Sequence, residues 1–260
     1  MHFIARYNDN WVLATNQSYS PVDFSWSDPS WPVPSKEGTE RTDDFSNTVR
    51  EFPVDPRAKL ICVGRNYAAH AQELGNEIPD QPLLFFKPSS SLLGPNGIIE
   101  IPKMSANVHY EGELVVVVGK RGRFIPEEEA LSYVFGYTIG LDMTARDLQR
   151  SDKTWFRGKG FDTFAPVGPW VAPPEAVDLN DCNLCLTLNG EVRQEGNTRD
   201  LIFKVPFLIH YISQIVTLEP GDLIFTGTPE GVGQVQPSDL LTVSIDGIGQ
   251  LNASVGHPSH

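Results

Sequence analysis

The sequence is poor in cysteine, and this shortage excludes two classes of protein. Three of its 260 residues are cysteine, an odd and low number that argues against a disulfide framework and predicts reduced thiols in a cytoplasmic protein. Cys182 and Cys185 have a Cys-x-x-Cys spacing, but no second pair is present to complete a zinc site. We therefore expect both side chains to pack in the core, as part of a strand predicted around residues 183–188.

Basic residues are also scarce. Lysine and arginine number 20 against 33 aspartate and glutamate residues, which gives a formal net charge of −13. Such an excess of negative charge disfavours binding to nucleic acid or to an anionic membrane surface. It does not exclude an anionic substrate, because a metal ion and a few local cations can reverse the potential inside a cleft.

Long apolar runs are missing as well. No stretch approaches the roughly 20 apolar residues of a membrane span, and residues 1–10 lack the basic segment and apolar core of a secretory signal. No internal repeat or low-complexity tract is present. With 40% hydrophobic and 20% charged residues, the chain has the composition of a folded, soluble protein. Its length allows one large domain, or a large domain with a small appendage.

The composition changes near residue 56. Residues 3–14 alternate as a strand or hairpin, whereas residues 18–56 are rich in Ser, Pro, Asp and Trp and show no clear periodicity. We therefore predict a small N-terminal module over residues 1–56, with a long irregular loop that its tryptophans hold against the main body. The main domain is predicted over residues 57–260.

The main domain reads as mostly β-structure with a few short helices. The dipeptide Asn189-Gly190 predicts a two-residue hairpin between two strands. The apolar spacing of residues 203–215 predicts the longest helix, with His210 as a packing residue. A loop followed by a short helix is expected over residues 65–75, and further short helices at residues 126–131 and 143–149. Further strands are expected at residues 58–64, 82–88, 108–119, 134–142, 240–245 and 250–255.

The most informative stretch is residues 108–119. Side chains alternate along a strand, so His109, Glu111 and Glu113 are expected on one face, which Val115 and Val117 continue into the core. Two carboxylates beside a core repel each other and lose hydration. A hard divalent cation removes both problems, since Mg²⁺, Mn²⁺ and Ca²⁺ prefer oxygen ligands. An edge strand with two solvated glutamates fits the same spacing, and both interpretations stay open at this point.

Asp142 ends a predicted strand and is placed to complete such a metal site. His70 and Glu73, three residues apart, share a helix face. A carboxylate beside an imidazole raises its basicity and fixes its orientation, although His-x-x-Glu is also a common surface pair. Glycines flank Lys159 on both sides and allow its ammonium to approach a ligand closely, or they form a flexible basic turn. The glycine-rich loop at residues 227–233 lacks the phosphate-loop lysine, so nucleotide binding is not expected.

Seven stretches in a fixed order resemble the fumarylacetoacetate hydrolase family, in particular its short acylpyruvase-like members. They are Val63-Gly-Arg-Asn-Tyr-Ala-Ala-His70, Phe86-Lys-Pro-Ser89, Tyr110-Glu-Gly-Glu-Leu114, Leu141-Asp-Met-Thr-Ala-Arg-Asp-Leu-Gln149, Gly158-Lys-Gly-Phe-Asp-Thr-Phe-Ala-Pro-Val-Gly-Pro169, Asn189-Gly-Glu191 and Pro220-Gly-Asp-Leu-Ile-Phe-Thr-Gly-Thr-Pro-Glu-Gly-Val-Gly233. The resemblance covers about residues 58–255. It implies a mixed β-sandwich or roll whose sheets wrap a metal site, and a homodimer.

The resemblance also implies roles for individual residues. Mg²⁺ or Mn²⁺ would be held by Glu111, Glu113 and Asp142. The catalytic residues would be His70 and Glu73, a dyad that activates water on a segment that orders over the substrate, and Lys159. The substrate-binding residues would be Arg65, Arg146, Gln149 and Thr228.

The implied partner is a small 2-oxo acid. Hydrolysis of the C–C bond of an acylpyruvate is the first expectation, because a His–Glu dyad serves to activate water. Decarboxylation of oxaloacetate passes through the same enolate and needs no activated water, and isomerisation of an unsaturated 2-oxo acid passes through a related dienolate. A non-catalytic binding protein is disfavoured, because the three carboxylates, the dyad and the lysine are all present.

Overall fold

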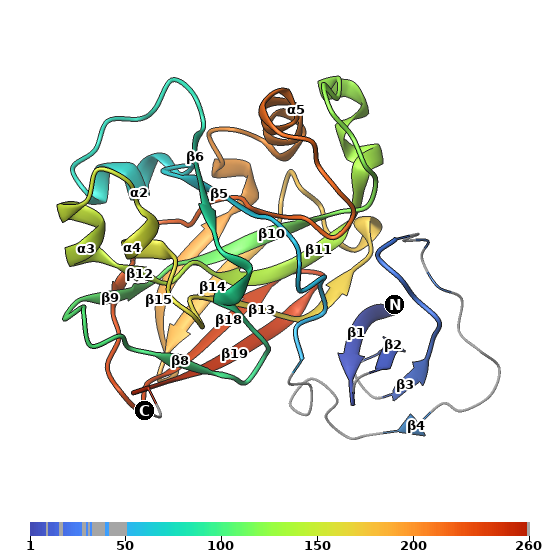
Figure 1. The fold of residues 1–260 in the computed structure, drawn as a ribbon, viewed down its shortest axis with the longest axis horizontal. Coiled ribbons are helices and arrows are strands. Elements are labelled where there is room, and N and C mark those ends of the chain that lie inside the picture. Colours follow the sequence, from blue (N-terminus) through green and yellow to red (C-terminus); the bar gives the residue numbers. More distant parts are fainter. Residues whose placement is uncertain are drawn as a thin grey trace.

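The protein is mainly β-structure, as the sequence predicts. The computed structural model describes residues 1–8, 10–15, 18–27, 30, 32, 40–41 and 51–258. Its largest sheet has eleven strands in the order β4-β3-β2-β1-β13-β11-β10-β16-β5-β6, with β7 paired to β13 (Figure 1). These strands are β1 (Phe3–Tyr7), β2 (Asn10–Ala14), β3 (Ser18–Pro21), β4 (Glu40–Arg41), β5 (Leu60–Gly64), β6 (Leu83–Lys87), β7 (Leu92–Leu93), β10 (Gly112–Val118), β11 (Val134–Leu141), β13 (Ala165–Ala172) and β16 (Leu223–Phe225).

Two smaller sheets complete the β-structure. One has the order β15-β14-β18-β19-β8 and the other β12-β9-β17. Most pairs are antiparallel, whereas β5 with β16, β7 with β13 and β8 with β19 are parallel. Their strands are β8 (Ile98–Glu100), β9 (Val108–Tyr110), β12 (Thr144–Ala145), β14 (Asn183–Leu188), β15 (Glu191–Asn197), β17 (Gly233–Gln234), β18 (Leu240–Ile245) and β19 (Gly249–Gly256).

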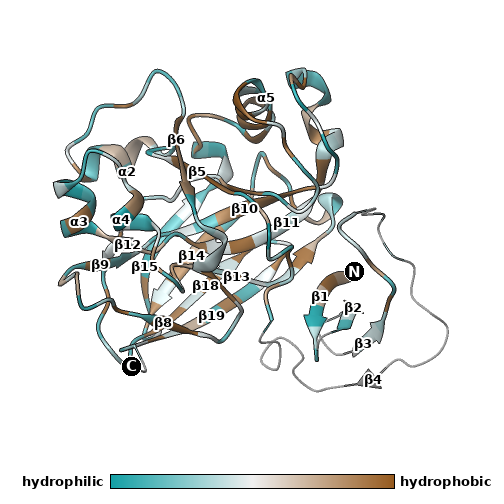
Figure 2. Ribbon diagram, viewed as in Figure 1, coloured by the Kyte–Doolittle hydropathy of each residue, from teal (hydrophilic) through white to brown (hydrophobic). Residues whose placement is uncertain are grey.

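The helices are short and lie around the sheets. Helices α2, α3 and α4 gather at one end of the sheets, and strands β1–β4 lie at the opposite end (Figure 1). The longest helix, α5, lies where the sequence places it and is mostly hydrophobic (Figure 2). The bounds are α2 (Ala68–Glu73), α3 (Arg146–Ser151), α4 (Phe156–Lys159) and α5 (Val205–Ile215), with 3₁₀ turns η1 (Ser89–Ser91), η2 (Glu127–Tyr133), η3 (Pro174–Ala176) and η4 (Thr198–Asp200).

The core lies on both faces of the large sheet. Along β10, Val116 belongs to one buried cluster, whereas Val115 and Val117 belong to the other. This division follows from the period of two along a strand. The expected hairpin also forms, since β14 and β15 pair across Asn189 and Gly190, and both turn residues have positive φ. Cys182 lies in the core just before β14 and Cys185 is half-buried within it, both with free thiols.

Two predicted elements are corrected. The single strand expected over residues 108–119 is interrupted at Glu111, because β9 pairs with β12 and β17 whereas β10 belongs to the large sheet. The chain therefore bends between two sheets at this residue. The helical turn expected from residue 143 begins only at Arg146, because Thr144 and Ala145 pair with β9.

The N-terminal strands extend the large sheet. Strand β1 pairs with β13, with Ile4 opposite Val171, and the rings of Trp26 and Phe135 have centroids 5.1 Å apart. The expected hairpin over residues 3–14 forms as β1 and β2. Residues 28–29, 31, 33–39 and 42–50 of the predicted irregular loop lie outside the described residues, and the domain boundary near residue 56 stays a prediction. No helix within the described ranges is long and apolar enough to cross a membrane.

Candidate active site

Three buried carboxylates converge next to the helical end of the sheets. Glu111 lies at the bend between β9 and β10, Glu113 is the second residue of β10, and Asp142 follows β11. One carboxylate oxygen from each lies within 4.8 Å of the other two, and the three residues are 4%, 2% and 1% exposed. The solvated edge strand that the spacing also allowed is therefore wrong.

The pairing of β10 with β11 brings these acids together. The two strands are antiparallel, with Glu113 opposite Gly140 and Gly112 opposite Leu141, so Asp142 falls beside the start of β10. The amide of Asp142 also donates to the carbonyl of Glu111 at 2.8 Å. His109 does not join them, contrary to the expected shared face. It lies on β9 beyond the bend, with Nε2 2.8 Å from Oδ1 of Asn107.

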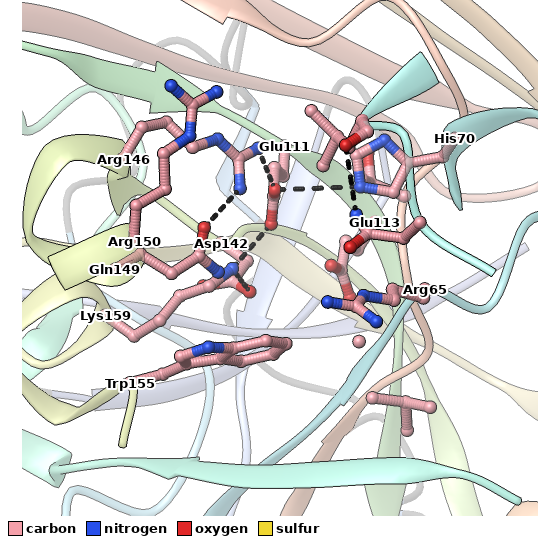
Figure 3. Close-up of a pocket in the computed structure, with 15 residues that line it drawn as sticks. Arg65, His70, Glu111, Glu113, Asp142, Arg146, Gln149, Arg150, Trp155 and Lys159 are labelled. Carbon is pink, nitrogen blue, oxygen red and sulfur yellow. Dashed lines mark hydrogen bonds and ion pairs between the residues drawn. The ribbon is translucent and has the colours of Figure 1, made fainter. Parts of the chain in front are cut away.

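A cavity of about 300 Å³ opens onto the carboxylates. Figure 3 shows the side chains that surround them. Nine of the ten site residues predicted from the sequence line this cavity, namely Arg65, His70, Glu111, Glu113, Asp142, Arg146, Gln149, Lys159 and Thr228. Glu73, the tenth, reaches the site through its contact with His70.

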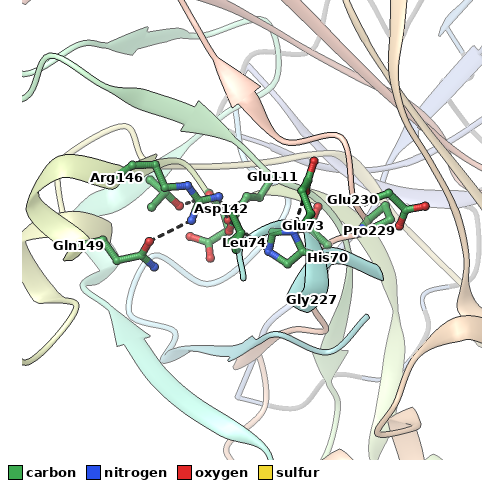
Figure 4. Close-up of polar contacts among 12 residues, drawn as sticks. His70, Glu73, Leu74, Glu111, Asp142, Arg146, Gln149, Gly227, Pro229 and Glu230 are labelled. Carbon is green, nitrogen blue, oxygen red and sulfur yellow. Dashed lines mark hydrogen bonds and ion pairs between the residues drawn. The ribbon is translucent and has the colours of Figure 1, made fainter. Parts of the chain in front are cut away.

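Helix α2 carries the predicted dyad. His70 Nδ1 lies 3.4 Å from Oε2 of Glu73, and His70 Nε2 lies 3.9 Å from Oε1 of Glu111 (Figure 4). The other oxygen of Glu73 accepts a hydrogen bond from the amide of Gly231 at 3.0 Å. His70 is buried, whereas about a third of the Glu73 side chain is exposed. Glu73 therefore orients the imidazole through Nδ1, and Nε2 faces the carboxylates.

Cations bind two of the three carboxylates. Arg146 donates to Oε1 of Glu111 and, at 3.0 Å, to Gln149. Lys159 Nζ lies 2.6 Å from Oε2 of Glu111 and also contacts Asp142. Helices α3 and α4 supply these residues from one side of the cavity. Thr228, a predicted substrate-binding residue, already uses its hydroxyl proton within the protein, since it donates to the carbonyl of Gly112 at 2.9 Å.

Glu113 lacks such a cation within the described part of the chain. Its Oε2 accepts one hydrogen bond, from the amide of Gly227 at 2.8 Å. Burial, together with the charges of Asp142 and Glu111, raises the pKa of Glu113 well above its usual range. For Glu111, burial acts in the same direction, but the charges of Arg146 and Lys159 outweigh it and lower the pKa.

The donor set fits a hard divalent ion. Three converging carboxylates offer oxygen ligands only, which is the chemistry that Mg²⁺ and Mn²⁺ prefer. A bound cation would give Glu113 the charged partner that the described residues do not supply, and burying an unpaired carboxylate is otherwise costly. The residues present therefore fit a metal at Glu111, Glu113 and Asp142.

Three further residues of the site carried no role in the sequence analysis. Lys87, at the end of β6, is buried, with Nζ 2.6 Å from Oδ1 of Asp142 and 3.0 Å from the carbonyl of Met143. The sequence did contain a sign of this role, because Lys87 is a charged residue at the end of an apolar strand, in the stretch Phe86-Lys-Pro-Ser89. Trp155 and Arg150 line the cavity, and no local pattern distinguishes them from surface residues.

Comparisons with known proteins show which family the chain belongs to. Residues 59–256 match the model of the C-terminal domain of fumarylacetoacetate hydrolase. The mitochondrial oxaloacetate decarboxylase of Dictyostelium discoideum is 50% identical over 195 residues, which cover 73% of this chain and 89% of that protein.

Two solved structures are also similar. Fumarylpyruvate hydrolase from Pseudomonas aeruginosa, in complex with Mn²⁺ and pyruvate, is 41% identical with a TM-score of 0.74 and covers 79% of this chain and 91% of its own. The 2-hydroxyhepta-2,4-diene-1,7-dioate isomerase from Mycobacterium marinum is 32% identical with a TM-score of 0.85 and covers 100% and 99%. The family model spans most of the chain, and the chain belongs to the fumarylacetoacetate hydrolase family.

Proposed function

We propose that the protein is a divalent-metal-dependent hydrolase of acylpyruvate-type 2,4-dioxo acids, which releases pyruvate and a carboxylic acid. The observation that carries the proposal is the His70–Glu73 pair held beside three buried carboxylates. Water activation needs a positioned base of this kind, and the carboxylates would hold a metal ion and its substrate within reach of that base. Fumarylpyruvate or acetylpyruvate are substrates of the proposed class.

Glu111, Glu113 and Asp142 would hold the ion, Mg²⁺ or Mn²⁺. A bound ion would supply Lewis-acid stabilisation of the negative charge that develops on the keto oxygen of a 2-oxo acid. Around it, Arg65, Arg146 and Gln149 offer donors to the substrate carboxylate. The support for this placement is the oxygen-only donor set and the shared cavity.

The proposed reaction begins with proton transfer to His70. Burial lowers the pKa of His70, and the charges of Glu111 and Glu73 offset only part of this effect, so the imidazole is neutral near pH 7 and can accept a proton. With Glu73 orienting the ring, Nε2 takes a proton from water, whose oxygen attacks the distal carbonyl carbon. The ammonium of Lys159 stabilises the resulting oxyanion. The C–C bond then breaks with its electron pair on C3 of pyruvate enolate, which recovers the proton from His70.

Oxaloacetate decarboxylation is the second candidate. The observation that favours it is the 50% identity to a protein named oxaloacetate decarboxylase. This reaction forms the same pyruvate enolate by loss of carbon dioxide and requires no activated water. Isomerisation of an unsaturated 2-oxo dicarboxylate is a third candidate, in which His70 would move a proton between two carbons, and the isomerase neighbour supports it.

A substrate panel separates these candidates. Acylpyruvates, oxaloacetate and an unsaturated 2-oxo dicarboxylate are assayed with Mg²⁺ or Mn²⁺, with and without EDTA. We expect acylpyruvate cleavage that EDTA abolishes, and a loss of roughly 10²–10⁴ in kcat for His70→Ala, the usual contribution of general acid–base catalysis. Oxaloacetate decarboxylation should largely survive that substitution.

His257→Ala is the matched control, because His257 is exposed near the C-terminus, away from the cavity. Equal losses of both reactions in His70→Ala would remove the reason for placing hydrolysis first. Wild-type protein that turns over no 2-oxo acid with either metal would contradict the proposal and favour a binding protein.

A further inference from the structure

Gln194 is a buried polar residue that the proposed reaction does not use. It lies on β15, in the five-stranded sheet, and is 1% exposed. Its side chain leaves that sheet and reaches the start of β10 and the loop after β16. Gln194 does not line the cavity, so it has no direct contact with a substrate held there.

The amide of Gln194 closes a ring of three hydrogen bonds. Gly112 N donates to Oε1 of Gln194 at 3.0 Å, and Nε2 of Gln194 donates to the hydroxyl of Thr228 at 2.8 Å. That hydroxyl donates in turn to the carbonyl of Gly112 at 2.9 Å. Both backbone groups of Gly112, the residue between Glu111 and Glu113, are therefore used by two side chains.

The second N–H of Gln194 Nε2 donates to the carbonyl of Pro229 at 2.8 Å. Pro229 belongs to the loop over residues 227–231, which we call the glycine loop. One end of the glycine loop donates from Gly227 N to Glu113 at 2.8 Å, and the other donates from Gly231 N to Glu73 at 3.0 Å. Figure 4 shows Pro229 and Glu230 beside Glu73 and His70.

We propose that Gln194 is a positioning residue that fixes Glu113 and the His70–Glu73 dyad relative to each other through the glycine loop. The inference rests on the proposed function for the roles of those residues. One amide satisfies an N–H, a hydroxyl and a carbonyl, all buried, and leaving such groups unpaired is costly. Loss of the amide frees the glycine loop, and with it the two hydrogen bonds that orient Glu113 and Glu73.

The test replaces Gln194 with methionine, which has a similar length and forms none of these hydrogen bonds. We expect Gln194→Met to weaken Mn²⁺ binding to the metal-free protein about tenfold or more, measured by calorimetry, since supporting partners of metal ligands contribute on this scale. We expect kcat to fall by a similar factor, with KM nearly unchanged because Gln194 lies outside the cavity. Glu195→Met is the matched control, on the same strand and exposed.

A second pair of variants keeps the test decisive if Gln194→Met does not fold. Thr228→Val removes the hydroxyl from the ring, whereas Thr228→Ser retains it. Because Thr228 also lines the cavity, the readout for this pair is Mn²⁺ affinity without substrate, which should fall in Thr228→Val and stay higher in Thr228→Ser. In the double variant Q194M/T228V, the two losses should not add, because both substitutions break one ring.

Unchanged Mn²⁺ affinity and kcat in Gln194→Met would overturn the inference. If that variant does not fold, equal Mn²⁺ affinities for Thr228→Val and Thr228→Ser would overturn it. Wild-type protein that binds Mn²⁺ but turns over no 2-oxo acid would instead refute the proposed function, and the Mn²⁺ affinities would still decide the role of Gln194.

Discussion

His70 has different neighbours at its two ring nitrogens, and this difference determines what it can do. Nδ1 faces Glu73 at 3.4 Å, and Nε2 faces Glu111 at 3.9 Å. Burial lowers the pKa of His70, while the charge of Glu111 and the hydrogen bond to Glu73 raise it by less. The ring therefore becomes protonated only at a pH below the ordinary histidine pKa of about 6.5. Glu73 accepts the proton of Nδ1–H, which leaves Nε2 unprotonated and able to accept a proton.

The pH dependence of kcat tests this balance. The neutral base is lost as the pH falls through the pKa of His70, so kcat should decline only below about pH 6.5. Glu73→Gln removes a negative charge that raises this pKa, and the acidic limb of kcat should therefore move to lower pH. The plateau should also fall about tenfold or more, because the ring is less well oriented.

The measurement is a pH–rate profile of wild type and variant with saturating metal. Glu77→Gln is the control, an exposed glutamate just beyond the same helix, and it should leave the profile unchanged. An acidic limb that moves to higher pH in Glu73→Gln would contradict the assignment.

Helices α3 and α4 approach each other closely at Gly158. A Cβ atom on Gly158 would lie 2.8 Å from Cβ and 2.9 Å from Cα of Gln149, a separation that side chains do not tolerate. The sequence suggested that the flanking glycines let Lys159 approach a ligand. At Gly158, the structure gives a different reason, since the glycine lets α4 pack against the helix that carries Arg146.

We expect Gly158→Ala to push these two helices apart and to shift Lys159 away from Glu111. Overpacking of this kind costs about 1–3 kcal/mol of stability. Under the proposed function kcat should fall about tenfold or more, because a displaced Lys159 would no longer stabilise the oxyanion. Thermal unfolding and steady-state kinetics measure the two effects.

Gly190→Ala serves as the comparison. Gly190 has φ +82° with no atom within 4 Å of an added Cβ, so alanine there should cost about 1 kcal/mol through backbone strain alone and leave kcat unchanged. If Gly158→Ala retained wild-type kcat, the contact between α3 and α4 would have no role in placing Lys159.

At the scale of the whole molecule, the N-terminal residues share a core with the main sheet. Trp26 and Phe24 lie on Phe135 of β11, with ring centroids 5.1 and 5.4 Å away, and β1 adds to β13. No described residue before Val63 lines the cavity. This part of the molecule should therefore affect stability rather than the reaction. The homodimer and the cytoplasmic location stay predictions, the first to be measured by light scattering.

Trp26 tests the separation between stability and catalysis. Trp26→Ala removes a buried ring and should lower the free energy of unfolding by about 3–5 kcal/mol. Trp26→Phe should cost much less, because Nε1 of Trp26 is buried without a hydrogen-bond partner among the described residues. Urea unfolding measures both, and kcat at 25 °C should match wild type in Trp26→Phe. A large loss of kcat in that variant would connect the N-terminal residues to the active site.

The sequence by itself determined the elements whose pattern is local. The period of two predicted the alternation along β10, Asn189 and Gly190 predicted a hairpin, and the apolar spacing of residues 203–215 predicted α5. The roles expected for the site residues came from the ordered resemblance to the fumarylacetoacetate hydrolase family, because each local pattern, such as His-x-x-Glu or a lysine between glycines, also fits a surface pair or a flexible turn.

Only the tertiary structure decided which distant groups meet. The bend at Glu111 arises because β9 and β10 pair in different sheets. Lys87 reaches Asp142 across 55 residues, and Gln194 reaches Gly112 across 82. Periodicity records which face of an element is buried, but it does not record what covers that face. Strand order brings these residues together, and strand order depends on the free energy of the whole packed core.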